Sequence, residues 1–333
     1  MGLRKGAGMA AAAMCLWMGA ANARSVEGWT LVDLGTLGGP GSYGAAISDT
    51  GNVVGCADLD AVTAHAFIYR DGAMRDLGPG CALAVNDRGI AAGRAGGGEL
   101  VVWLESDIAH LGVRGTIGGI NNANVVVGSY AQGTGTRAFR FANGALDTLM
   151  DDSASSANAI NARGEIAGTS SAGAFTWRDG AMNMLGTLGG NRSDAKGIND
   201  SSQVVGLATD EHGQPLSFLY DGGMKALEAP GYSGATAINN RGQIVGSAEG
   251  SGGYFLDAGI YDRLDTLPPV VAQHWRKLTP TGINNQGWIV GTGTNSAGDL
   301  RAFLLIPGIT PEKMKPARAA LTGAATATRT QAP

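Results

Sequence analysis

The residues best suited to binding chemistry stand together in one connection near the end of the patterned part of the sequence. His274, Trp275 and Arg276 lie within residues 265–280, and Lys277 follows them. An indole ring can stack on a sugar ring, and flanking cations can form charge-assisted hydrogen bonds to an acidic group. In a purely structural interpretation, Trp275 fills a hydrophobic gap between neighbouring repeats. We expect a ligand site here, because long loops on rigid scaffolds often carry function.

Four further polar residues are candidates for the same ligand-binding surface. Asp58 and Asp60 lie in a loop of the first repeat, and Arg192 and Asp194 lie in a loop of the fifth. These side chains could bind a carbohydrate, a peptide or a protein. Alternatively, rim residues such as Asp194 and His274 could serve a polysaccharide hydrolase or lyase, for which two carboxylates about 5 to 9.5 Å apart would be expected.

The sequence lacks the common catalytic and metal-binding motifs. It contains no Gly-x-Ser-x-Gly elbow, no phosphate-binding loop and no His-Glu-x-x-His pair. His65 and His212 each have aspartates nearby, but surface histidines in such places are usually solvated. The sequence therefore predicts no catalytic residue, no metal site and no cofactor. It favours a non-catalytic binding protein, with a structural component of the cell envelope as a further alternative.

These candidates are carried by a unit that repeats seven times. Each unit has a turn of the type Ile-Asn-Asp-x-Gly that leads into a short strand ending in glycine. The closing glycines are Gly55, Gly93, Gly128, Gly168, Gly206, Gly246 and Gly291. The steps between them are 38, 35, 40, 38, 40 and 45 residues, which is the period of a four-stranded propeller blade.

Each unit is expected to contain four short strands. The first is small and apolar, the second resembles Val-Val-Gly, and the third carries an aromatic residue, as in residues 66–69 and 174–177. Alternating apolar residues of this kind are typical of strands. The turn Asn and Asp residues can accept a backbone N–H two residues on, and the glycine supplies a positive φ. Turn formation explains them better than calcium binding, because the alternating oxygen ligands of a calcium loop are missing.

The sequence His65-Ala66-Phe67 and two Leu-Gly-Thr-Leu-Gly-Gly segments, residues 34–39 and 185–190, resemble a known family. They are similar to the bacterial extracellular repeat family named HAF after its His-Ala-Phe signature, over roughly residues 29–306. Only the first unit keeps the histidine. The resemblance implies an envelope or extracellular location and a repeat fold, and it transfers no catalytic residue.

Both ends of the patterned region lack part of a unit. Residues 29–34 look like a fourth strand without the three before it, and residues 301–306 look like a third strand without a fourth. Pairing the two would close a ring and leave no exposed sheet edge between the first and last repeats. The sequence predicts an all-β fold, a seven-bladed β-propeller of four-stranded blades over residues 24–307, closed by the N-terminal strand completing the last blade. An open stack or a two-sheet packing of the same strands is the alternative.

The segments outside the repeats are predicted to be a signal peptide and a tail. Residues 1–23 have a positive start, an apolar stretch and a small-x-small cleavage site at residues 21–23. We therefore expect a periplasmic or extracellular protein. Residues 308–333 are rich in Ala, Thr and Pro and are expected to form a flexible tail.

Charge and hydropathy narrow the possible partners. Without Arg4 and Lys5 of the predicted signal, the chain has 22 basic and 28 acidic residues, a net charge of −6. This balance disfavours nucleic acid as a partner. No later segment approaches the roughly 20 apolar residues that a transmembrane segment needs. We expect a soluble or peripherally attached monomer that binds a glycan, peptide or protein ligand.

Cys56 and Cys81 are the two cysteines that remain once Cys15 leaves with the signal. Cys56 follows the second strand of the first unit, and Cys81 precedes the first strand of the second. In a propeller both positions lie on the same rim of neighbouring blades. The sequence predicts a disulfide between them in an oxidising compartment, with free thiols as the alternative.

Overall fold

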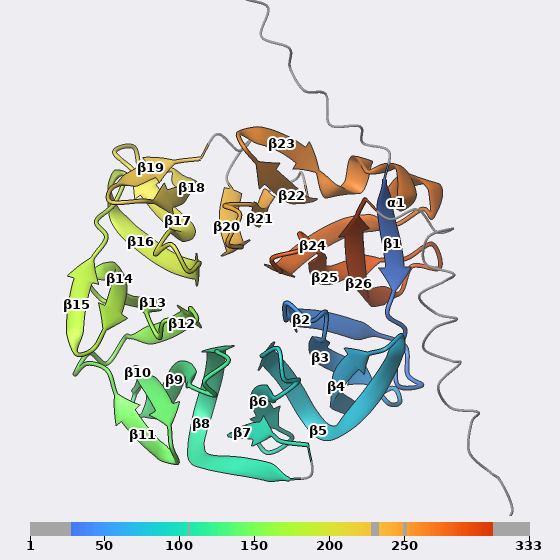
Figure 1. Ribbon diagram of the computed structural model, residues 1–333, viewed down its shortest axis with the longest axis horizontal. Helices are drawn as coiled ribbons and strands as arrows, with labels where there is room; N and C mark the ends of the chain where they lie inside the picture. The colour runs from blue at the N-terminus through green and yellow to red at the C-terminus, as the bar shows by residue number, and fades with distance from the viewer. Residues whose placement is uncertain (1–27, 106, 228–232, 249–251, 309–333) are drawn as a thin grey trace, which may run out of the picture.

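A computed structural model describes residues 28–105, 107–227, 233–248 and 252–308 of the chain, apart from the side chain of Ser233. The strands form seven antiparallel blades around a central axis (Figure 1). The predicted signal peptide lies outside the described residues, as does the predicted tail beyond Gly308. Within the described part of the chain, no helix has the length and apolar character needed to cross a membrane.

Blades 1 to 3 form one continuous sheet of ten strands. Blade 1 contains β2 (Ser42–Ile47), β3 (Val53–Asp58), β4 (Ala64–Arg70) and the first part of β5 (Ala73–Val85). Blade 2 contains the rest of β5, β6 (Ala91–Ala95), β7 (Glu99–Trp103) and the first part of β8 (Ile108–Ile120). Blade 3 contains the rest of β8, β9 (Val126–Gln132), β10 (Gly135–Ala142) and β11 (Ala145–Thr148). The strands β5 and β8 therefore each serve two blades, as the outer strand of one and the inner strand of the next.

The other four blades are separate four-stranded sheets. Blade 4 contains β12 (Ser156–Ile160), β13 (Ile166–Ser170), β14 (Gly173–Arg178) and β15 (Ala181–Met184). Blade 5 contains β16 (Gly189–Ile198), β17 (Val204–Asp210), β18 (Pro215–Tyr220) and β19 (Met224–Ala226). Blade 6 contains β20 (Ser233–Ile238), β21 (Ile244–Ala248), β22 (Gly252–Asp257) and β23 (Ile260–Arg263). Blade 7 contains β24 (Arg276–Ile283), β25 (Ile289–Thr294), β26 (Leu300–Pro307) and β1 (Trp29–Asp33).

The N-terminal strand closes the ring, as the sequence predicts. β1 pairs antiparallel with β26, so that Trp29 is opposite Pro307 and Asp33 is opposite Phe303 (Figure 1). Leu31 is buried in one cluster with Phe303 and residues of blade 6. The prediction of a seven-bladed propeller completed by the first strand is confirmed.

The repeated glycine of the second strand has a steric cause. In every blade the first strand carries a bulge opposite the second strand. The bulge brings a carbonyl against the glycine, so that a Cβ atom on Gly55 would lie 1.8 Å from the carbonyl oxygen of Tyr43. The ring of Phe67 approaches the same point to 2.8 Å. Any larger residue would therefore break the pairing of all three strands.

The hydrophobic core is a series of clusters between adjacent blades. The aromatic residue predicted in the third strand lies opposite the closing glycine in six blades, and Val101 takes this place in blade 2. These six residues, all buried, are Phe67, Phe139, Phe175, Phe218, Tyr254 and Phe303. The clusters join residues of neighbouring blades, as where Ala167 of blade 4 and Phe218 of blade 5 share one. Each blade therefore buries its apolar side chains against the next blade.

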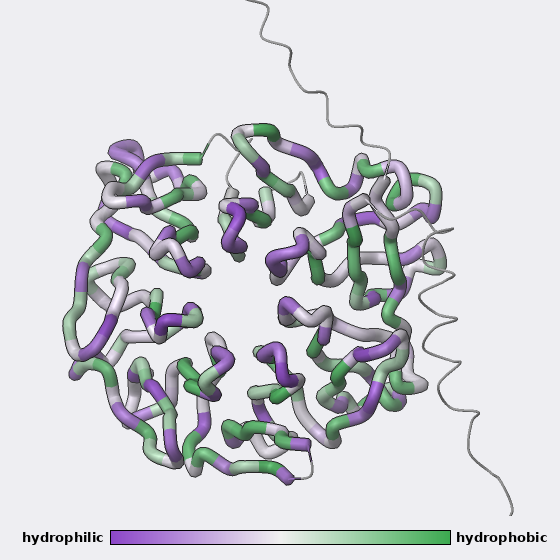
Figure 2. The backbone as a smooth tube through the Cα atoms, in the orientation of Figure 1, coloured by the Kyte–Doolittle hydropathy of each residue, from purple (hydrophilic) through white to green (hydrophobic). Residues whose placement is uncertain are grey.

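The propeller has two distinct faces. The turns that join first to second strands and third to fourth strands lie on one face, the turn face. The connections from second to third strands and from one blade to the next lie on the other, the loop face. Figure 2 shows the innermost turns in the purple of hydrophilic residues, around the axis. The centre of the turn face is therefore polar.

Candidate ligand-binding site

A surface pocket of about 450 Å³ opens on the loop face, at the connection between blades 6 and 7. This connection contains the 3₁₀ helix η1 (Leu264–Thr266) and the helix α1 (Pro268–Ala272). The lining residues are Asp265, Val271, His274, Trp275, Arg276 and Ser296. Three of the seven residues predicted to bind ligand therefore line one pocket.

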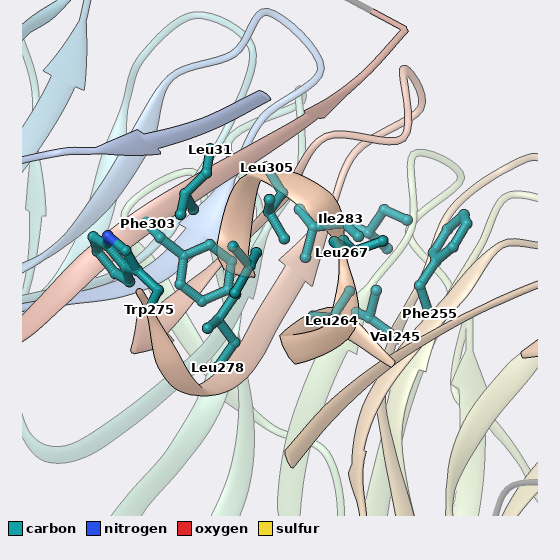
Figure 3. Packing of buried hydrophobic residues seen from close by; sticks show 12 residues of the cluster. Leu31, Val245, Phe255, Leu264, Leu267, Trp275, Leu278, Ile283, Phe303 and Leu305 are labelled. Atoms are coloured by element: carbon teal, nitrogen blue, oxygen red, sulfur yellow. The ribbon is translucent and has the colours of Figure 1, made fainter. Parts of the chain in front are cut away.

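Trp275 is largely enclosed beneath this pocket. The residue is only 5% exposed, and its ring packs edge-on against Phe303, with ring centroids 6.4 Å apart. Figure 3 shows it at the edge of the cluster that also contains Leu278 and Phe255. The ring thus fills the space between blades 6 and 7, and its faces are not open for stacking.

The pocket contains hydrogen-bond donors that have no protein partner. Trp275 lines the pocket, and its indole Nε1 forms no hydrogen bond with a described residue. Because Nε1 is not one of the fully enclosed side-chain atoms that lack a partner, it is accessible. His274 and Arg276 are exposed and form no ion pair with a described residue. The carboxylate of Asp265 is already engaged, because Arg263 donates to it from Nε at 3.0 Å and from Nη2 at 2.6 Å.

The predicted residues Asp58 and Asp60 lie on blade 1, in and after β3. Asp60 Oδ1 accepts the backbone N–H groups of Val62 and Thr63, each at 2.8 Å. These hydrogen bonds, the Val62 bond first, lower the pKa of Asp60. Asp58 uses its backbone N–H and carbonyl to pair with residues 39–41. Asp60 therefore orders the loop that carries it.

The predicted residues Arg192 and Asp194 lie on β16 of blade 5. Arg192 Nη2 is 3.8 Å from Asp194 Oδ2, and the arginine is exposed. Neither this pair nor Asp58 and Asp60 line the pocket that contains His274. The structure thus distributes the seven predicted residues over blade 1, blade 5 and the connection between blades 6 and 7. No cluster of three or more His, Cys, Asp or Glu suited to a metal occurs in the described part of the chain.

A second pocket, which the sequence does not predict, lies at the axis of the turn face. Its volume is about 190 Å³. Each of the seven turns contributes three consecutive residues, and all seven turns are described by the structure. The lining consists of residues 47–49, 85–87, 120–122, 160–162, 198–200, 238–240 and 283–285.

The middle residue of each turn forms an inner ring of hydrogen bonds. In six blades it is an asparagine whose Nδ2 donates to the backbone carbonyl of the middle residue in the next blade. Asn86 reaches the carbonyl of Asn121 at 3.2 Å, for example. The side-chain oxygens of these asparagines accept N–H groups of their own turns. Ser48 has no side-chain amide to donate, so the inner ring is open between blades 1 and 2.

The third residue of each turn forms an outer ring. At six joints between blades, its backbone N–H donates to the side-chain oxygen of the third residue in the next blade. The bond from Asp49 to Asp87 Oδ1 is 2.8 Å long. Ala162 has no side-chain oxygen, so the outer ring is open between blades 3 and 4. The turn residues therefore both shape their own turns, as predicted, and hold neighbouring blades together.

The signature histidine has a structural role in blade 1. His65 Nδ1 lies 2.8 Å from Asp76 Oδ2 on the neighbouring strand β5. In blade 2 the pair is reversed, since Glu99 Oε2 lies 2.9 Å from His110 Nδ1. The hydrogen bond to His110 lowers the pKa of Glu99. Both pairs connect the third strand of a blade to its fourth.

The predicted disulfide between Cys56 and Cys81 is present and joins β3 to β5. The prediction is confirmed. The bond links blade 1 to blade 2, which is the joint at which Ser48 leaves the inner ring open.

No protein-family model and no curated protein matches this sequence, so the resemblance to the HAF family rests on its motifs alone. Solved structures do match. YCF48 bound to a D1 peptide is 12% identical, with 85% of this chain and 97% of that chain covered and a TM-score of 0.50. The extracellular domain of BT4673 from B. thetaiotaomicron is 10% identical, with 83% of this chain covered and a TM-score of 0.50. The match spans 40% of that second chain. At these identities the similarity is one of fold, and the chain shares the β-propeller fold with both.

Proposed function

We propose that this protein is a non-catalytic binding propeller that works outside the cytoplasm and holds a peptide segment on its loop face. The observation that carries the proposal is the pocket at the connection between blades 6 and 7. Its donors, the indole N–H of Trp275 and the side chains of His274 and Arg276, have no partners among the described residues. Groups that are exposed and unpaired in a rigid frame are available to a ligand.

Binding is favoured over catalysis by the arrangement of the acidic groups. Asp265, the one carboxylate that lines this pocket, is bonded to Arg263 on both oxygens. The alternative of a polysaccharide hydrolase or lyase relied on rim residues such as Asp194 and His274. These two residues belong to blade 5 and to the connection before blade 7, so one cleft containing both has no support.

A location in the periplasm or outside the cell is supported by two observations. The Cys56–Cys81 disulfide would persist in an oxidising compartment. The pattern of residues 1–23 is that of a secretory signal. A peptide is the first ligand class to test, because YCF48, which has the same fold, binds a D1 peptide.

The proposal can be tested by applying the exported protein to a peptide array and to a glycan array. We expect binding to a subset of peptides and reduced binding by the Arg276→Gln variant. Binding confined to glycans would instead support a carbohydrate-binding protein. Release of reducing ends from a polysaccharide would contradict the non-catalytic proposal.

A further inference from the structure

We infer that the pocket between blades 6 and 7 recognises a side-chain carboxylate of an acidic peptide. This inference rests on the proposed function and narrows it to one ligand chemistry. The pocket combines the indole N–H of a buried tryptophan with an exposed arginine and an acid that is already paired, and together these features suit an anionic acceptor group.

The indole N–H of Trp275 is the most specific of these features. The residue is 5% exposed, and its Nε1 has no hydrogen-bond partner among the described residues. Nε1 is not among the fully enclosed side-chain atoms that lack a partner, so it is accessible and can donate to water or to a ligand. Since the ring is wedged against Phe303, the N–H cannot turn to another protein acceptor. An acceptor on a ligand would satisfy it.

The surrounding charges select an anion for that acceptor. Arg276 and His274 line the same pocket and are exposed, with no ion pair to a described residue. Asp265 would repel a carboxylate, but its charge is offset by Arg263 through two hydrogen bonds of 3.0 and 2.6 Å. The unpaired positive charge at the pocket therefore belongs to Arg276, whose planar guanidinium can bind both oxygens of a carboxylate.

A peptide suits this pocket better than an acidic glycan. Sugar rings are usually held by stacking on an exposed aromatic face, and both faces of Trp275 are covered by its own core. The exposed apolar residue of the pocket is Val271, which is 56% exposed. An aliphatic contact of this kind fits a peptide side chain next to the acidic one. The net negative charge of the chain opposes the approach only weakly, because salt screens charges beyond about 8 Å.

The experiment uses three probes against the exported, full-length, oxidised protein. These are a capped hexapeptide of alternating alanine and glutamate, its alanine and glutamine counterpart, and trigalacturonate. Affinities are measured by titration calorimetry. The indole N–H resonance of Trp275, assigned through the Trp275→Phe variant, is followed by NMR during the same titrations.

We expect the glutamate peptide to bind at least about tenfold more tightly than the glutamine peptide and to shift the Trp275 resonance. Arg276→Gln should weaken glutamate binding by about tenfold, because it removes the paired charge. The matched control is Arg75→Gln, which removes an exposed arginine on β5 of blade 1 and should leave the affinity within about twofold.

Three outcomes would overturn the inference. Equal affinity for the two peptides would show that the ligand carboxylate is not recognised. Wild-type affinity in Arg276→Gln would show that the peptide does not bind in this pocket. Tighter binding of trigalacturonate than of the glutamate peptide would make the occupant an acidic glycan. If the two hexapeptides bind equally but the array shows peptides whose binding is weakened by Arg276→Gln, the inference fails while the proposed function stands. If no peptide binds on the array, the proposed function fails as well.

Discussion

The side-chain amide of Asn284 in blade 7 donates to the backbone carbonyl of Ser48 in blade 1 at 3.1 Å, across 236 residues of sequence. The outer ring closes at the same joint, where the backbone N–H of Asn285 donates to Asp49 Oδ1 at 2.7 Å. Both sets of inter-blade hydrogen bonds therefore cross the joint between the last blade and the first. This joint is stabilised by bonds that exist only when the propeller is complete.

Asn284→Asp should weaken the closing joint. The new carboxylate keeps an oxygen for the N–H groups of its own turn but has no hydrogen to donate to Ser48. We expect the free energy of unfolding to fall by about 1–3 kcal/mol, because the carbonyl loses its donor and faces a negative charge. Urea denaturation measures this. Gln286→Glu places the same charge on an exposed neighbour and is the control, and an equal loss in both variants would contradict the role of the amide.

Ser48→Asn should close the gap in the inner ring. Asparagine occupies this position in the other six turns, so the new amide has the geometry to reach the carbonyl of Asn86. One added hydrogen bond between blades should raise the free energy of unfolding by about 0.5–1.5 kcal/mol. A variant that is no more stable than the wild type in urea would mean that the blade 1 to blade 2 joint differs from the others.

Replacing both Cys56 and Cys81 by serine should destabilise the same joint. The disulfide closes a loop with a sequence separation of 25 residues, for which we expect a loss of about 3 kcal/mol. Adding Ser48→Asn to the double variant should restore part of the loss, because both features connect blade 1 to blade 2. Thermal unfolding is measured for the wild type, Ser48→Asn, the double cysteine variant and the triple variant. If Ser48→Asn stabilises the double cysteine variant no more than it stabilises the disulfide-bonded protein, the two effects are independent.

Leu31→Ala should test closure by the N-terminal strand. Leu31 is 5% exposed and belongs to the cluster that joins blades 6 and 7. Truncating a buried leucine leaves a cavity and should cost about 2–5 kcal/mol. Val62→Ala, at a residue that is 93% exposed, is the control. Chemical denaturation that shows similar losses for the two variants would argue against a structural role for this strand.

Tyr254→Phe should reduce the alkaline sensitivity of the fold. Burial raises the pKa of Tyr254 to about 12, above its value in the unfolded chain. A raised pKa contributes stability at neutral pH that is lost as the pH rises from about 10 through 12. Phenylalanine fills the equivalent position in five blades, so the variant should fold. Unfolding followed between pH 8 and about 12 should show a weaker pH dependence for the variant, and identical profiles would contradict this.

The sequence by itself determined the architecture, because the information is local and repeated. A turn motif and a closing glycine recur at the period of a blade, the two incomplete end units predict closure, and Cys56 and Cys81 fall on one rim. Each of these inferences needs only the spacing of residues along the chain. The structure confirms all three.

Only the tertiary structure decided what the polar residues do. The turn asparagines predicted to shape their own turns also bond the next blade, and a partner about 40 residues away is set by the curvature of the ring. Trp275 is a residue type that often stacks on sugar rings, but the packing of blades 6 and 7 buries its ring. Burial and hydrogen-bond partners are properties of contacts between blades, and these contacts form only when the ring closes.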